Sequence, residues 1–171
     1  MIFFIIFALV VLILIALVFV FNQLITLRNR CNNQWSQIDI QLKRRNDLIP
    51  KLVTFVKEYA THEKQTFERV AEARSAVNSS DNPKEAAIAS DNLSSSLRGV
   101  FAVAEAYPDL KANEQYKQLA EELIETEDKI AHSRMFYNEI VQRYEQRRLT
   151  FPSSIIADIF RFKQKQYFKS N

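Results

Sequence analysis

The amino-acid sequence predicts an all-α protein, with an N-terminal transmembrane helix followed by an antiparallel helical bundle of three long helices plus a short fourth. Residues 1–21 are all apolar and contain no charged residue, glycine or proline. Residues 22–171 contain one glycine and four prolines, too few for the many tight turns of a β protein. Apolar side chains recur there at the seven-residue spacing of packed helices.

The apolar segment 1–21 has the length of a membrane span. At about 1.5 Å per residue a helix of this length covers roughly 31 Å, close to the hydrocarbon thickness of a bilayer. It lacks the positive n-region and small-residue cleavage site of a signal peptide, so we expect an uncleaved anchor. Arg28 and Arg30 follow the segment closely. The positive-inside rule therefore predicts a single-pass protein of the cell membrane, with the lipid bilayer contacting residues 1–21 and the bundle in the cytoplasm.

The bundle domain, residues 22–171, is expected to begin with a helix over about 22–78. With Leu24 at position d, the heptad frame has the same register on both sides of Pro50. This favours a kinked but continuous helix. In the alternative interpretation a new helix begins at Asp47 as N-cap, with Pro50 in its first turn.

Cap signals delimit the other helices, expected over about 83–106, 114–149 and 153–163. Asn82 is followed by Pro83 and Glu85, the pattern of a capped start with proline at the first helical position. Asn113 is a plausible cap for the third helix, and Pro152 ends it.

Nothing in the residue pattern indicates catalysis. His62-Glu63 begins like a zinc-protease motif, but Thr66 stands where the second histidine is needed. Cys31 is the only cysteine. We therefore expect no enzyme activity, catalytic residue, metal, cofactor or small-molecule substrate. The net charge is only +3 and the basic residues are interleaved with acids, so we expect no nucleic-acid partner.

Three groups of residues are candidates for function. The first is an interface of Cys31, Trp35 and Ile38. The second bundle helix is too short to reach back to these residues, so an exposed apolar seam is expected there. The partner would be a second copy of the chain or another membrane protein.

The second group is a buried ion pair between Glu127 and either Arg44 or Arg45. These charges fall at or beside inward heptad positions, where an unpaired charge costs several kcal/mol. In the alternative, they extend to the bundle surface.

The third group is a basic and aromatic tail, which resembles an interfacial membrane-binding segment. Alternatively, the apolar face of 155–162 packs on the bundle and the residues from Lys163 onward are frayed. The residues of the tail are Phe160, Arg161, Phe162, Lys163, Lys165, Tyr167 and Phe168.

Several stretches resemble the LemA family, in the same order along nearly the whole chain. They are WSQIDIQLKRRNDLIPKLV (35–53), VFAVAEAYPDLKAN (100–113), ETEDKIAHSRMFYNEIVQRYEQ (125–146), the Phe151-Pro152 step and FRFKQKQYF (160–168). The resemblance implies a bacterial membrane protein with an anchor and a helical bundle, and it implies no reaction. We therefore expect a membrane-anchored scaffold or assembly protein acting through protein–protein contacts. The alternative is a membrane-organising or membrane-shaping protein that acts through self-association and its tail.

Overall fold

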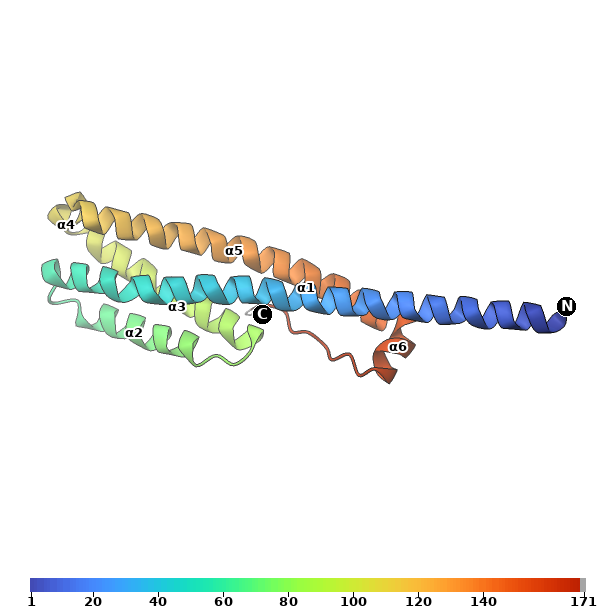
Figure 1. Ribbon diagram of the computed structural model, residues 1–171. Helices are drawn as coiled ribbons and strands as arrows, with labels where there is room; N and C mark the ends of the chain where they lie inside the picture. Colours follow the sequence, from blue (N-terminus) through green and yellow to red (C-terminus); the bar gives the residue numbers. More distant parts are fainter. Residues whose placement is uncertain (170–171) are drawn as a thin grey trace.

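The computed structural model describes residues 1–169, and these form six helices without a strand. The expected all-α architecture of an apolar helix joined to a bundle is confirmed (Figure 1). The helices are α1 (Ile2–Tyr59), α2 (Lys64–Asn78), α3 (Pro83–Glu105), α4 (Pro108–Ala112), α5 (Glu114–Leu149) and α6 (Ser153–Ile159).

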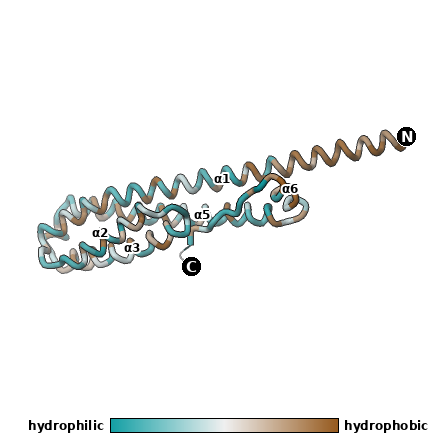
Figure 2. Tube along the Cα trace, turned by 90° about the horizontal axis from the view of Figure 1, so that it is seen from below, coloured by the Kyte–Doolittle hydropathy of each residue, from teal (hydrophilic) through white to brown (hydrophobic). Residues whose placement is uncertain are grey.

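Helix α1 contains both the apolar segment and the first helix of the bundle. Residues 2–19 are exposed to the surroundings, whereas Val20 and Leu24 are buried against the rest of the chain. Among the described residues, α1 is the one helix long and apolar enough to cross a membrane. Figure 2 shows that its protruding end is hydrophobic along its whole length.

Pro50 lies inside α1, so the helix continues through it and no new helix begins at Asp47. Proline has no backbone N–H and cannot bond the carbonyl of the residue four positions earlier. Here that carbonyl belongs to the buried Asn46, and it accepts a hydrogen bond from Arg74 Nε of α2 at 3.0 Å. A side chain of another helix thus replaces the bond that proline removes.

The expectation of one helix from 22 to 78 is wrong, because α1 ends at Tyr59 and the chain turns over residues 60–63 before α2 begins. Tyr59 and Glu63 held inward positions in the heptad frame. In the structure Tyr59 is 37% exposed, and Glu63 is the N-cap of α2. No glycine or proline marks this turn, and α2 has its own helical spacing of buried residues, so the pattern concealed the reversal.

The cap signals of the later helices are present as atomic contacts. Asn82 Oδ1 accepts a hydrogen bond from the Glu85 N–H at 3.0 Å at the start of α3. Asn113 Oδ1 accepts hydrogen bonds from the N–H groups of Gln115 and Tyr116 at the start of α5. Helix α5 has the expected bounds, whereas the segment before it, expected to be a loop, contains the short helix α4.

Helix α6 ends at Ile159, four residues earlier than expected. Arg161 adopts the left-handed conformation (φ 51°), which interrupts the helix and reverses the chain. Residues 162–169, which we call the strap, then run back along the bundle without regular secondary structure (Figure 1).

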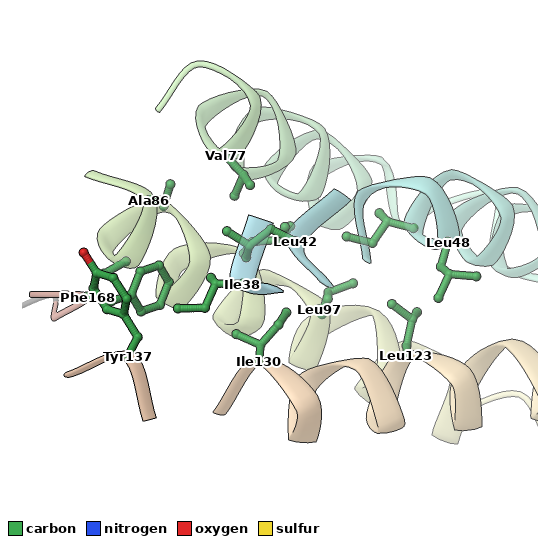
Figure 3. Close-up of a cluster of buried hydrophobic side chains, with 14 of the residues drawn as sticks. Ile38, Leu42, Leu48, Val77, Ala86, Leu97, Leu123, Ile130, Tyr137 and Phe168 are labelled. Carbon is green, nitrogen blue, oxygen red and sulfur yellow. The ribbon is translucent and has the colours of Figure 1, made fainter. Parts of the chain in front are cut away.

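The course of the chain explains where the core is. Helix α1 leaves the apolar end, α2 returns, α3 leaves again, and α5 runs back along α1 for 36 residues, roughly 54 Å. Buried side chains of α1 and α5 meet along this length. Those of α2 and α3 join them in the half away from the apolar segment, and those of α6 and the strap join them in the half beside it. Figure 3 shows this core with Ile38, Leu42, Leu97, Leu123, Ile130, Tyr137 and Phe168 among its members.

The contact between Arg74 and the Asn46 carbonyl gives a double-mutant test of the role of Pro50. We expect Arg74→Met to lower the free energy of unfolding by about 1.5–3 kcal/mol, because it leaves a buried carbonyl unbonded. In a Pro50→Ala background the new N–H bonds that carbonyl, so the loss should be smaller by about 1 kcal/mol or more. Urea denaturation of the full chain in detergent micelles, followed by circular dichroism, measures both. Arg69→Met, an exposed change on the same helix, is the control, and equal losses in the two backgrounds would contradict the assignment.

Candidate interfaces of the bundle

The predicted interface of Cys31, Trp35 and Ile38 is covered from within the chain. Cys31 is 1% exposed and Ile38 is fully buried. The half-buried Trp35 ring lies 5.8 Å from the Tyr137 ring and 5.9 Å from the Phe168 ring, measured between centroids. The premise of an uncovered seam is therefore wrong, because α5 returns along α1 and the strap closes the remaining side.

Side chains of α5 hold the strap by its backbone. The hydroxyls of Tyr137 and Tyr144 donate to the carbonyls of Gln166 and Lys163, each at 2.8 Å. The Phe168 N–H donates to Asn138 Oδ1 at 2.8 Å. The Phe168 carbonyl accepts hydrogen bonds from Arg134 Nε and Asn138 Nδ2. Glu145 Oε1 accepts a hydrogen bond from the Lys165 N–H at 2.7 Å. An extended segment needs partners for its buried backbone groups, and helix side chains provide them here.

The expected membrane-contact tail divides into two parts. Phe162 and Phe168 are buried and Tyr167 is half-buried, so these rings belong to the bundle core rather than to a lipid-facing surface. Lys165 Nζ donates to Asn32 Oδ1 of α1 at 2.7 Å, so the alternative of a frayed segment after Lys163 is also wrong.

The other part of the tail consists of Phe160, Arg161 and Lys163, which are exposed. Phe160 lies beside α1, with its ring centroid 4.8 Å from that of Phe21. Only these three of the seven tail residues are free to meet a bilayer.

Cys31 lines a groove of about 290 Å³ between α1, the start of α3, α5 and the strap. Burial raises the pKa of its thiol to about 11, although the nearby Lys165 ammonium partly offsets this effect. Burial also raises the pKa of the Tyr137 hydroxyl. Both groups are neutral at physiological pH, so Cys31 has the character of a structural thiol rather than a nucleophile.

Arg45 of α1 is fully buried, and side chains of two other helices, α3 and α5, surround its guanidinium. Its Nη1 is 2.7 Å from Glu127 Oε1 of α5 and 3.0 Å from Ser94 Oγ of α3. Its Nη2 donates to Ser90 Oγ at 2.9 Å, and Ser94 Oγ also donates to Glu127 Oε1. The expected pairing of Glu127 is thus present with Arg45, and the pair is only partly buried, because the Glu127 side chain is 34% exposed. The two serines were not foreseen, although their spacing of four residues on the small-residue face of α3 was a usable signal.

Arg44 takes no part in this buried cluster. Its Nη2 lies 3.8 Å from carboxylate oxygens of Glu122 and Glu125, and all three side chains are substantially exposed. Such surface pairs contribute little to stability. The expected alternative of Glu127 with Arg44 is therefore not what the structure shows.

Within residues 1–169 no group of three or more His, Cys, Asp or Glu side chains is arranged to hold a metal ion. His62 and Glu63 lie at the turn before α2, where Glu63 has the backbone role of a cap. Two groups of residues remain as features of the bundle, the covered seam around Cys31 and the Arg45 cluster.

Comparison with known proteins identifies a family and several relatives of this chain. The model of the LemA family matches residues 34–171, which confirms the resemblance noted in the sequence. The chain is 28% identical over 137 residues to Protein LemA of Metamycoplasma hominis, a match covering 80% of this chain and 63% of that protein. It is 23% identical to the magnetosome protein MamQ 2 of Paramagnetospirillum magneticum, covering 87% of this chain and 64% of the relative. The magnetosome protein MamQ of Magnetospirillum gryphiswaldense is similar at the same identity, with 86% of this chain and 64% of the relative covered. The chain thus spans slightly less than two thirds of the length of these relatives.

The Arg45 cluster predicts a specific loss of stability. Glu127→Gln keeps the shape of the side chain but leaves the buried guanidinium without its counter-charge, so we expect a loss of about 2 kcal/mol. Glu125→Gln on the exposed side of the same helix is the matched control and should change stability by less than about 0.5 kcal/mol. Urea denaturation of both variants measures the difference, and an unchanged midpoint for Glu127→Gln would contradict the pairing with Arg45.

The strap predicts the reactivity of the single thiol. Phe168→Ala removes the fully buried ring that fixes the strap beside Trp35, so the groove should open and the pKa of Cys31 should fall towards its usual range. We expect maleimide labelling of Cys31 at pH 8 to become faster by more than about tenfold, because the thiolate is the reacting form. Phe136→Ala, an exposed phenylalanine of α5, is the control. Equal labelling rates in the two variants would show that the strap does not protect the seam.

Proposed function

The chain belongs to the LemA family, and on that premise we propose that it is a membrane-anchored scaffold or assembly protein acting through protein–protein contacts at the bacterial cytoplasmic membrane. The proposal includes a single span in α1 and a cytoplasmic bundle, supported by Arg28 and Arg30 after the apolar segment. It assigns no reaction and no cofactor. The similarity to membrane-associated helical relatives supports the setting rather than the specific role.

The observation that carries the proposal is the unbroken course of α1 from Ile2 to Tyr59. From Asn22 to Tyr59 this helix is roughly 57 Å long, and α5 stiffens most of that length. A flexible tether would let a domain diffuse about its anchor. A rigid helix instead holds the sides of the bundle at fixed heights above the bilayer, which is useful to a protein that positions others.

The lateral faces of the bundle, rather than the seam, are available for partners. Cys31 and Ile38 are buried, so they cannot form the interface expected from the sequence. Large apolar side chains are exposed instead at several points on three helices. They are Ile40 of α1, Ile88 of α3, and Ile124, Met135 and Phe136 of α5.

A second candidate function is membrane organisation through self-association. It is favoured by the exposed Phe160, Arg161 and Lys163 beside the apolar end of α1. In this case the bundle would contact copies of itself, and its contacts would depend on the lipid.

In-cell photo-crosslinking from the lateral faces tests the proposal. A photoreactive amino acid at Phe136 or Ile124 should give a discrete crosslink to one other protein, whereas the same probe at the buried Ile38 should give none. Products between copies of the chain that depend on lipid composition would favour membrane organisation. Probes at all the exposed positions that capture nothing above the Ile38 background would contradict both functions.

A flexible insertion is the second arm of this experiment. A short Gly/Ser segment after Asn22 leaves the span and the bundle intact but uncouples their directions. We expect it to abolish the crosslinks from Phe136, because the height and orientation of that face are no longer fixed. Crosslinks unchanged by the insertion would mean that α1 is only a tether.

A further inference from the structure

The turn between α5 and α6, together with α6, carries a cluster of exposed large apolar side chains. We call this cluster the apolar tip, and its members are Leu149, Phe151, Ile155, Ile159 and Phe160. Each of these side chains is between 52% and 76% exposed. They come from a stretch of twelve residues and gather at one end of the bundle. Scattered exposed apolar residues are ordinary, whereas a concentrated group of this kind indicates an interaction surface.

The position of α6 determines where the tip lies along α1. Helix α6 packs against both α1 and α5 through Ile156 and Ala157. Phe160 and Phe162 contact Phe21, the last residue of the apolar segment, with ring centroids 4.8 and 5.8 Å apart. Figure 1 shows α6 at the end of the bundle from which α1 alone continues. The tip therefore stands at the height where the membrane span of α1 begins.

The charges around the tip match a lipid surface. Arg147, Arg161 and Lys163 flank it, whereas Arg148 is paired with Glu145 at 2.8 Å. Asp158 is the one acidic residue between positions 147 and 163. Arg28 and Arg30 are also exposed, on the part of α1 that follows the apolar segment. An apolar face bordered by basic residues is the composition of segments that lie in the headgroup region of a bilayer.

We propose that the apolar tip inserts into the headgroup and acyl-chain boundary of the leaflet from which α1 emerges. The occupant of this surface is lipid, because the tip is continuous with the lipid-facing surface of α1 and carries the basic border of an interfacial segment. The protein then has two attachments to the bilayer, the span of α1 and the tip. The inference depends on α1 spanning the bilayer and is independent of the scaffold role.

Spin-label depth measurements on the full chain test this placement. The chain carries Cys31→Ala and one label site, Phe151→Cys or Ile159→Cys, and is reconstituted in vesicles of equal parts phosphatidylcholine and phosphatidylglycerol. Labels at both sites should be accessible to oxygen, protected from aqueous nickel chelate, and located about 5–10 Å below the phosphates, the depth of interfacial helices. A label at Met135, which is 62% exposed on α5, is the aqueous control, and one at Leu14 is the lipid reference.

Two results would overturn the proposal. Tip labels as accessible to the nickel chelate as the label at Met135 would place the tip in water. Tip labels that are protected and show dipolar broadening between copies, lost on dilution with unlabelled chain, would mean that a second copy covers the tip.

A charged variant separates insertion from a change in the fold. Ile155→Asp together with Ile159→Asp alters only exposed positions, so the helical circular dichroism should be retained. The label at Phe151 should then move from the lipid-like to the water-like accessibility. An unchanged depth in this variant would show that the apolar face does not hold the tip in the bilayer.

Discussion

The structure depends on the continuity of one helix, α1, which contains both the apolar segment and the first helix of the bundle. An α-helix satisfies its own backbone hydrogen bonds, so α1 enters the bundle with its geometry already fixed. Its buried stripe, from Leu24 through Cys31 and Ile38 to Leu52, then determines which sides of the helix the other elements can cover. Helix α5 covers this stripe for most of its length. The bundle therefore continues in the direction of the apolar segment, and no linker separates the two.

Two irregularities of α1 are resolved by residues from other helices, and both specify how the helices align. Pro50 frees the carbonyl of Asn46, which Arg74 of α2 then bonds. Arg45 places a charge in the core, which Glu127 of α5 and two serines of α3 surround. An apolar stripe alone tolerates sliding by a turn, because neighbouring layers resemble one another. A buried charge or an unbonded carbonyl does not, since a shift leaves it without a partner.

The sequence predicted those features that depend on local chemistry. The apolar segment, the caps at Asn82 and Asn113 and the bounds of α5 all follow from residue types at fixed spacing. The same spacing predicted that Glu127 pairs with Arg44 or Arg45, and the structure selects Arg45. The turn at 60–63 could not be predicted, because the chain reverses there without glycine or proline and helical spacing resumes at once. The strap was missed for a related reason. Its basic and aromatic residues resemble a membrane-binding segment. Phe162 and Phe168 are buried because α5 packs along α1 and forms a core at that point, which the local sequence does not show.

The two halves of the bundle are built differently. Away from the span, α1 packs with α2, α3 and α5, and helices cover its stripe on every side (Figure 1). Helices α2 and α3 meet near Trp35 and extend no closer to the span, so α6 and the strap complete the core between Val20 and Trp35. There the strap has no internal backbone hydrogen bonds and relies on Tyr137, Asn138, Tyr144 and Glu145 of α5. Segments held by side chains open at lower free energy than helices that also bond within themselves. The half of the bundle next to the apolar segment is thus the half whose cover depends most on side-chain contacts.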